Sequence, residues 1–389
     1  MADNVEIQGQ VDPRFNRVKE AFAHNFVTKG EVGAAVAITL DNRTVVDIWA
    51  GFADRAKTRP WTRDTIVNVW STTKGPAAMC LHRLAEQGRL DLDAPVSRYW
   101  PEFAQAGKEK VLVSYLLNHK AGLPALKQQI PAEMLYDWEA MTAALAAHAP
   151  WWEPGTRHGY HAFTYGYLIG EVLRRITGKT LGTYLHEEIA QPLGLDFHIG
   201  LDARHDSRVA QMIGADPPPP STEPNPFAEA FKDQESLSYK ALSNPTSLMQ
   251  VKTINTREWR GAEIAAANGH GTARALARLY GALACGGAVD GVQVLSADSI
   301  RRCYTEQSRG LDAVLLRETR FSLGFMLPQP GMPNGRNPRN FGHPGAGGSI
   351  AYADPDARIG FAYVMNKMRQ DNALDSRAAA LIDAMYASL

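Results

Sequence analysis

The sequence predicts an α+β fold with two lobes, in which an antiparallel sheet flanked by helices adjoins a mostly helical lobe. Two apolar runs, residues 34–40 and 44–50, enclose Asp41-Asn42-Arg43, a combination that indicates a β-hairpin near the N-terminus. Residues 349–365 hold a second pair of apolar runs, separated by the turn Asp354-Pro355-Asp356. Between the two hairpins, apolar residues recur mainly at helical spacing.

The hairpins lie near opposite ends of the chain, so we expect one sheet to be assembled from both ends. Residues 1–70 and 255–389 would form this sheet lobe and residues 71–254 the helical lobe, within a single domain overall. A length of 389 residues suits two lobes with sizeable cores. Terminal helices would flank the sheet, and the C-terminal one is indicated by Ala378, Ala379, Leu381, Ile382 and Met385.

Ser71-Thr72-Thr73-Lys74 stands where a strand-like run, residues 64–70, gives way to a helical pattern. Residues three apart share a helix face, so the Ser71 hydroxyl and the Lys74 amine would lie one turn apart. A buried lysine of lowered pKa can take the proton that makes a serine nucleophilic. A helix-capping serine beside a solvated lysine is the usual alternative, but no other serine here has a lysine three residues later. The helical pattern consists of Ala77, Leu81, Leu84 and Ala85.

Two further motifs follow along the chain. Residues 154–162 begin with the turn signal Pro154-Gly155, and a helical pattern then runs to Gly178, which is suited to ending a helix. Tyr160 therefore precedes a helix, where its phenol could face a cleft. Residues 341–348, Phe-Gly-His-Pro-Gly-Ala-Gly-Gly, lead into the second hairpin, and their glycines indicate that another group approaches the backbone closely.

In this order the three motifs resemble those of the serine β-lactamase and penicillin-binding-protein superfamily, and more narrowly those of the family VIII carboxylesterases. The resemblance covers most of the chain, because residues 90–96, 116–124 and 271–277 also match, with Thr272 as a helix N-cap. It implies a serine β-lactamase-like fold, built like the class C β-lactamases. We expect the active-site cleft at the boundary between the lobes, where ligand sites are common.

Two departures from the superfamily's motifs favour an ester over a lactam. Where β-lactamases usually carry Lys-Thr-Gly or Lys-Ser-Gly, this chain has His343, Pro344 and Gly345. A lysine and a hydroxyl suit the carboxylate of a β-lactam, whereas His343 is largely neutral at pH 7 and Pro344 has no hydroxyl. Ala162 stands where the second motif usually has an asparagine that holds an amide side chain. The site therefore suits a small neutral ester.

The resemblance implies acyl transfer through a covalent intermediate on Ser71. Lys74 and Tyr160 would form one proton-transfer pair, in which either neutral Lys74 or ionised Tyr160 is the base. The backbone N–H groups of Ser71 and Ala346 would bind the oxyanion. Residues expected to contact the substrate are His343, Gly345, Trp151 and Trp152, although structural roles are equally compatible with the histidine and the tryptophans. His119 and His270 are expected to be structural.

Composition restricts the remaining function classes. Acidic and basic residues balance at 41 each, which argues against nucleic acid or a membrane surface as a partner. The polar start of the chain and the lack of a bilayer-spanning apolar run predict a cytoplasmic protein. Cys80, Cys285 and Cys303 are expected to be reduced thiols, and residues 216–226, with six prolines, a surface loop.

We therefore predict a serine carboxylesterase that needs no cofactor or metal and acts on a small-molecule ester. A β-lactamase or D-amino peptidase, an acyltransferase and a catalytically inactive binding protein are the alternatives. The sequence leaves open the acyl chain and alcohol of the substrate, the identity of the general base and the oligomeric state.

Overall fold

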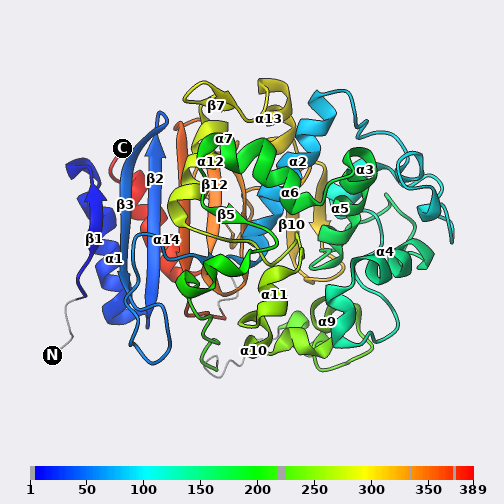
Figure 1. Cartoon of the computed structure of the whole chain (residues 1–389), viewed down its shortest axis with the longest axis horizontal. Helices are drawn as coiled ribbons and strands as arrows, with labels where there is room; N and C mark the ends of the chain where they lie inside the picture. Colours follow the sequence, from blue (N-terminus) through cyan, green and yellow to red (C-terminus); the bar gives the residue numbers. More distant parts are fainter. Residues whose placement is uncertain (1–4, 218–224, 333, 371–373) are drawn as a thin grey trace.

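The computed structural model describes residues 5–217, 225–332, 334–370 and 374–389. A six-stranded antiparallel sheet, built from both ends of the chain as predicted, lies toward one side of the molecule (Figure 1). The strands lie in the order β1 (Gln8–Val11), β3 (Arg43–Gly51), β2 (Gly33–Leu40), β13 (Ile359–Met365), β12 (Ile350–Asp354) and β11 (Phe341–Pro344).

Helices cover both faces of this sheet. The helices α1 (Asn16–Thr28) and α14 (Ser376–Tyr386) pack together on one face (Figure 1). The other face is covered by α12 (Ala273–Ala284), where the backbone of Ala277 lies directly over Gly360. Because side chains of a strand alternate between faces, Gly360 points to α12 and Tyr363 to the terminal helices. This arrangement buries β12 and β13 completely.

The turn chemistry read from the sequence is confirmed at three places. Asp41 and Asn42 join β2 to β3 with φ values of 50° and 61°, the left-handed pair that a tight hairpin requires. Gly178 ends α5 (Thr164–Thr177) in the left-handed conformation. The Thr272 side chain accepts a hydrogen bond of 3.1 Å from the Ala275 N–H and so caps α12.

The strand-like run before Ser71 is shorter than expected. Only β4 (Val67–Asn68) is a strand, in a small sheet with β6 (His270–Gly271) and β5 (Phe197–His198). The chain leaves that sheet at Trp70, which adopts a left-handed φ of 48° and starts a 3-10 turn, Trp70–Thr73. Ser71 therefore lies in this turn, and α2 (Lys74–Glu86) begins only at the lysine.

The other elements are short helices and hairpins around this frame. They are α3 (Val113–Leu117), α4 (Trp138–Ala147), α6 (Leu181–Leu185), α7 (Gln191–Leu193), α8 (Pro226–Ala230), α9 (Leu237–Ser243), α10 (Val251–Ile254), α11 (Arg257–Gly261), α13 (Ala297–Tyr304), β7 (Ala288–Val289), β8 (Val292–Gln293), β9 (Ser308–Leu311) and β10 (Glu318–Phe321).

Two further expectations can be compared with the described residues. The predicted surface loop is residues 216–226, and most of it, residues 218–224, lies outside the described residues. Its last residue, Pro226, begins α8 rather than continuing the loop, because proline is tolerated in a first helical turn. All three cysteines are free thiols. Within the described ranges, no helix has both the length and the apolar character needed to cross a membrane.

Candidate active site

A constrained turn presents Ser71. Trp70 is 8% exposed and holds its left-handed backbone although it is a bulky residue, a conformation that costs about 1–3 kcal/mol. The Trp70 carbonyl accepts a hydrogen bond of 2.5 Å from the Thr73 hydroxyl, which itself accepts one of 2.9 Å from the Gly269 N–H. These bonds tie the turn to the end of the small sheet. Such local strain is found where a reactive side chain must be held in one place.

Lys74 lies fully buried behind the serine. Its Nζ is 3.1 Å from Ser71 Oγ, and it donates to the carbonyls of Ala162 and Ala266 at 2.9 Å each. Burial lowers the pKa of Lys74 well below its usual value, and no carboxylate among the described residues forms an ion pair with it. A neutral amine has two N–H groups and one lone pair. The two carbonyls use both N–H groups, which leaves the lone pair for the Ser71 hydroxyl.

Tyr160 completes the group from the loop before α5. The Lys74 Nζ lies 4.7 Å from the centroid of the Tyr160 ring. Burial raises the pKa of the Tyr160 phenol, and its hydrogen bond with Ser71 opposes this only in part. The phenol is therefore protonated at neutral pH and can act as a proton donor. The structure thus brings together the three predicted residues, which come from two separate segments of the chain.

Two backbone N–H groups are predicted to bind the oxyanion. Those of Ser71 and Ala346 donate to no other group in the described part of the chain. Strand β11 lies close to the serine turn because the Ser349 hydroxyl donates to the Val69 carbonyl at 2.8 Å and lies 3.2 Å from the Thr72 hydroxyl. Free N–H groups of this kind can stabilise the oxyanion that forms when a carbonyl is attacked.

Gly345 allows this close approach. Its backbone is ordinary extended chain, with φ −109° and ψ 152°, so no left-handed conformation demands a glycine. A Cβ atom placed there would lie 2.2 Å from both the Val69 carbonyl oxygen and the Ser349 hydroxyl. The prediction that another group approaches this backbone closely is confirmed, and the group is the serine turn itself.

His343 is a neutral, buried residue of β11. Its Nδ1–H donates to the Pro344 carbonyl at 2.7 Å, and its Nε2 is buried with no partner among the described residues. Burial lowers the pKa of His343 to about 3. The ring stacks on that of Tyr160, with centroids 5.8 Å apart. His343 therefore supports the Tyr160 ring and contributes no positive charge to the site.

The two tryptophans pack beside the Tyr160 loop. Trp151 donates from Nε1 to the Ala125 carbonyl at 2.8 Å, and its ring lies under the Lys127 amine. Trp152 is buried against Gly159, where an added Cβ would lie 2.8 Å from its ring. These are packing contacts, and a direct contact with substrate stays a prediction for both residues.

His119 and His270 have the hydrogen bonds of structural residues. His119 Nδ1 accepts from the His161 N–H at 3.1 Å, and His270 Nδ1 lies 2.8 Å from the Asn268 carbonyl. Among the described residues, no group of three histidine, cysteine or acidic side chains gathers as metal ligands would.

Sequence reasoning missed Asp312, which holds Tyr160 in place. Its fully buried carboxylate accepts the N–H of Tyr160 at 3.0 Å and those of Val314 and Leu315 at 2.8 Å each. It also accepts from the Thr319 hydroxyl at 3.2 Å. No pattern in the sequence marks this aspartate, because its partner Tyr160 is 152 residues away.

An apolar cluster around Tyr160 also had no signal in the sequence. It joins residue 125, residues 160–162, residue 241 and several residues between 314 and 332, so no single run has a distinctive composition. The buried members besides Tyr160 are Ala125, Ala162, Ala241, Val314, Phe321, Met326 and Met332.

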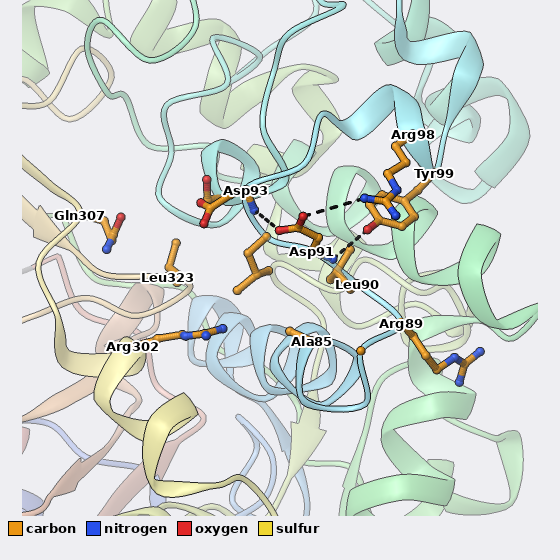
Figure 2. A pocket seen from close by; sticks show the side chains of 13 residues that line it. Ala85, Arg89, Leu90, Asp91, Asp93, Arg98, Tyr99, Arg302, Gln307 and Leu323 are labelled. Atoms are coloured by element: carbon orange, nitrogen blue, oxygen red, sulfur yellow. Dashed lines mark hydrogen bonds and ion pairs between the residues drawn. The ribbon is translucent and has the colours of Figure 1, made fainter.

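A cavity of about 500 Å³ lies away from these residues, at the far end of α2. One of its lining residues, Ala85, is about 16 Å from Lys74 along the helix axis, at about 1.5 Å per residue. Figure 2 shows its charged lining, in which the Asp91 carboxylate lies 3.9 Å from Arg98 and the Asp91 N–H donates to the Tyr99 hydroxyl. The cavity contains none of the predicted site residues, and we assign it no part in the chemistry.

A helix-flanked antiparallel sheet with a Ser–Lys–Tyr group in contact defines a serine hydrolase of the β-lactamase type. The chain belongs to the beta-lactamase family, whose model matches residues 18–384. The predicted fold and family are thereby confirmed.

Proteins similar to this chain include hydrolases and a penicillin-binding-protein homologue. The esterase/beta-lactamase LipL of Mycobacterium tuberculosis is 38% identical over 363 residues, which is 92% of this chain and 83% of the relative. The crystal structure of a family VIII carboxylesterase has a TM-score of 0.91 at 41% identity, covering 99% of this chain and 100% of the other. A penicillin-binding-protein homologue from Caulobacter crescentus has a TM-score of 0.89 at 43% identity, with the same coverage.

Proposed function

We propose that this protein hydrolyses small neutral esters through an acyl-enzyme on Ser71. It is a serine hydrolase of carboxylic esters, as its family and its esterase and carboxylesterase relatives, matched over most of the chain, indicate. The observation that carries the mechanism is the buried Lys74 amine, 3.1 Å from Ser71 Oγ, with both N–H groups of its neutral form directed at carbonyls.

In the first half-reaction, Lys74 takes the proton of the Ser71 hydroxyl while Ser71 Oγ attacks the ester carbonyl carbon. The N–H groups of Ser71 and Ala346 bind the oxygen that becomes negative. When the ester C–O bond breaks, Tyr160 gives its proton to the leaving alkoxide and recovers one from Lys74. Of the two candidate bases, the lowered pKa of Lys74 and the raised pKa of Tyr160 favour Lys74.

In the second half-reaction a water molecule replaces the alcohol. Lys74 again accepts the proton as the water attacks the acyl carbon, and the proton returns to Ser71 Oγ as the acyl–enzyme bond breaks. The acid product leaves and the free serine is regenerated.

The preference for a neutral ester rests on His343. A substrate carboxylate at this strand would need a cation or a set of donors, and His343, with its pKa near 3, provides no charge. Pro344 and Ala162 likewise offer no side-chain donor. We therefore predict a small neutral ester as the substrate. A cytoplasmic location is a separate prediction from the sequence.

β-Lactam hydrolysis is the second candidate, because LipL is named both an esterase and a β-lactamase. A panel of p-nitrophenyl esters of increasing acyl length, run beside nitrocefin, distinguishes the two. We expect kcat/KM for the short esters to exceed that for nitrocefin. The opposite ranking would indicate that the protein is a β-lactamase. Labelling with a fluorophosphonate, followed by peptide mass spectrometry, should place the adduct on Ser71.

A further inference from the structure

We propose that Arg377 of α14 is a positioning residue for the proposed oxyanion site: it holds the Gly347 carbonyl and thereby aims the Ala346 N–H. The inference rests on the proposed function, because it assumes that the Ala346 N–H receives the oxyanion. Arg377 itself does not touch the reacting atoms. It is fully buried and donates a hydrogen bond to the turn formed by residues 346–348.

Arg377 is fixed because all five of its N–H groups have partners. One Nη2 bond reaches the Gly347 carbonyl at 2.9 Å and one Nη1 bond reaches the Lys367 carbonyl at 2.9 Å. The Nε and the second Nη2 bond hold Asp375 at 3.0 and 2.8 Å, and the second Nη1 bond holds Glu31 at 2.9 Å. A guanidinium has five donors in a rigid fork, so none is left to rotate toward another partner.

The anchor is connected to the sheet and to the N-terminus of its own helix. Glu31 precedes β2, and its second carboxylate oxygen accepts a short hydrogen bond from the Tyr363 hydroxyl of β13. Asp375 also accepts from the Arg377 N–H at 2.8 Å and so caps α14. The position of the guanidinium is therefore set by the sheet and the terminal helix, and not by the turn that it holds.

The turn has an external anchor in addition to two bonds of its own, from the Gly345 N–H to the Ser349 carbonyl at 2.6 Å and from the Gly348 N–H to the Gly345 carbonyl at 3.2 Å. Gly347 and Gly348 have φ values of 83° and 130°, and two consecutive glycines give a chain with many alternative conformations. The Gly347 carbonyl accepts from Arg377 and, at 3.1 Å, from the Arg369 N–H. These two bonds select one orientation of the Gly347–Gly348 peptide unit, which lies two peptide units after the one that carries the Ala346 N–H.

Gly348 lies directly on the ion cluster. A Cβ atom there would be 2.4 Å from Asp375 Oδ2 and 2.8 Å from Arg377 Nη2. No side chain fits between the turn and the cluster, so a change on either side should move the turn. This gives two variants: Arg377→Lys alters the anchor, and Gly348→Ala, which also strains the backbone at φ 130°, displaces the turn while leaving every charge in place.

The experiment compares both variants with Tyr386→Phe, a control on the same helix. Tyr386 donates to Asp354 at 2.5 Å and accepts from Asn340 at 3.0 Å, so its removal loosens α14 far from the turn. Active sites are counted by fluorophosphonate titration. The kcat per active site, KM for p-nitrophenyl butyrate, and affinity for a boronic acid that forms a tetrahedral serine adduct are then measured.

We expect Arg377→Lys and Gly348→Ala each to lower kcat per active site by about 10- to 100-fold. Removing a whole oxyanion donor lowers kcat by about 100- to 1,000-fold, and a misaimed donor should cost no more than the lower end of that range. Boronate affinity should fall in parallel, KM should change little, and Tyr386→Phe should lower Tm without changing kcat. The inference is overturned if Gly348→Ala keeps kcat and boronate affinity within about twofold of the unmodified protein, or if Tyr386→Phe lowers both equally. Because Arg377→Lys leaves buried carboxylates poorly paired, Gly348→Ala decides the outcome if that variant does not fold. An active Ser71→Ala protein would instead refute the proposed function.

Discussion

Replacing Gly345 with alanine should disable catalysis through one added methyl group. Residue 345 has φ −109° and ψ 152°, which alanine adopts without strain, so the backbone conformation is not the obstacle. The obstacle is the Val69 carbonyl oxygen, which would lie 2.2 Å from the new Cβ, with the Ser349 hydroxyl equally close and the Thr72 hydroxyl at 3.0 Å. The hydroxyls can rotate, but the Val69 carbonyl belongs to the backbone that leads into Ser71.

The loss in rate can be estimated from how far β11 and the serine turn must move apart to admit the new Cβ. A tolerable C···O contact is about 3.3–3.6 Å, so β11 and the serine turn must separate by about 1 Å. That separation moves the Ala346 N–H away from Ser71 by a similar amount. A misplacement of about 1 Å costs about 100-fold in rate, and overpacking costs about 1–3 kcal/mol of stability.

The assay is kcat and KM for p-nitrophenyl butyrate, with Tm measured in parallel. Gly214→Ala is the matched control, since its Cβ would meet only Val251, at 3.3 Å, and it lies outside the proposed site. We expect the Gly345→Ala loss to appear in kcat, with Tm lowered by a few degrees and the control nearly unaffected. Retention of more than about a third of kcat by Gly345→Ala would refute the reasoning that close approach of β11 to the serine turn is required.

The remaining predictions concern the reacting groups. Ser71→Ala should remove ester hydrolysis with circular dichroism unchanged, and a residual rate above about a thousandth of the original would indicate another nucleophile. Lys74→Ala and Tyr160→Phe should each lower kcat strongly. The double variant should have a kcat scarcely below that of the worse single variant, because the pair acts as a unit. If the two losses in kcat multiplied cleanly, this shared role would be contradicted. The kcat/KM of the unmodified protein should fall as pH drops through the lowered pKa of Lys74, since only the neutral amine accepts a proton, and a pH–rate profile without an acid limb would exclude this base. Finally, the double substitution His343→Lys and Pro344→Thr should raise nitrocefin turnover relative to ester turnover, and an unchanged ratio would show that the missing cation is not what disfavours lactams.

Much of the fold was predictable because its signals are local. The hairpin at Asp41-Asn42 follows from two residues that tolerate a left-handed backbone between alternating apolar runs. The ends of α5 and α12 follow from Gly178 and Thr272, each of which satisfies backbone groups within one turn. The division into lobes at residues 71 and 254 stays a prediction.

The 3-10 turn at Ser71 was not predictable. Residues 64–70 have the composition of a strand, but β4 ends at Asn68 and Trp70 takes a left-handed φ. A tryptophan does not favour that conformation by itself. It is held there by hydrogen bonds to Thr73 and, through it, to Gly269, which lies 196 residues further along the chain.

The sequence by itself determined the class of fold, the family and the contact between Ser71 and Lys74, because hairpins, caps and residues three apart depend on short-range geometry. Tertiary structure alone decided what those groups can do. Burial sets the protonation of Lys74, Tyr160 and His343, and it arises from packing by segments that no local pattern connects. The supports of the site are equally non-local: Arg377 meets Glu31 across 346 residues, and such buried ion pairs form only when the complete sheet brings both ends of the chain together.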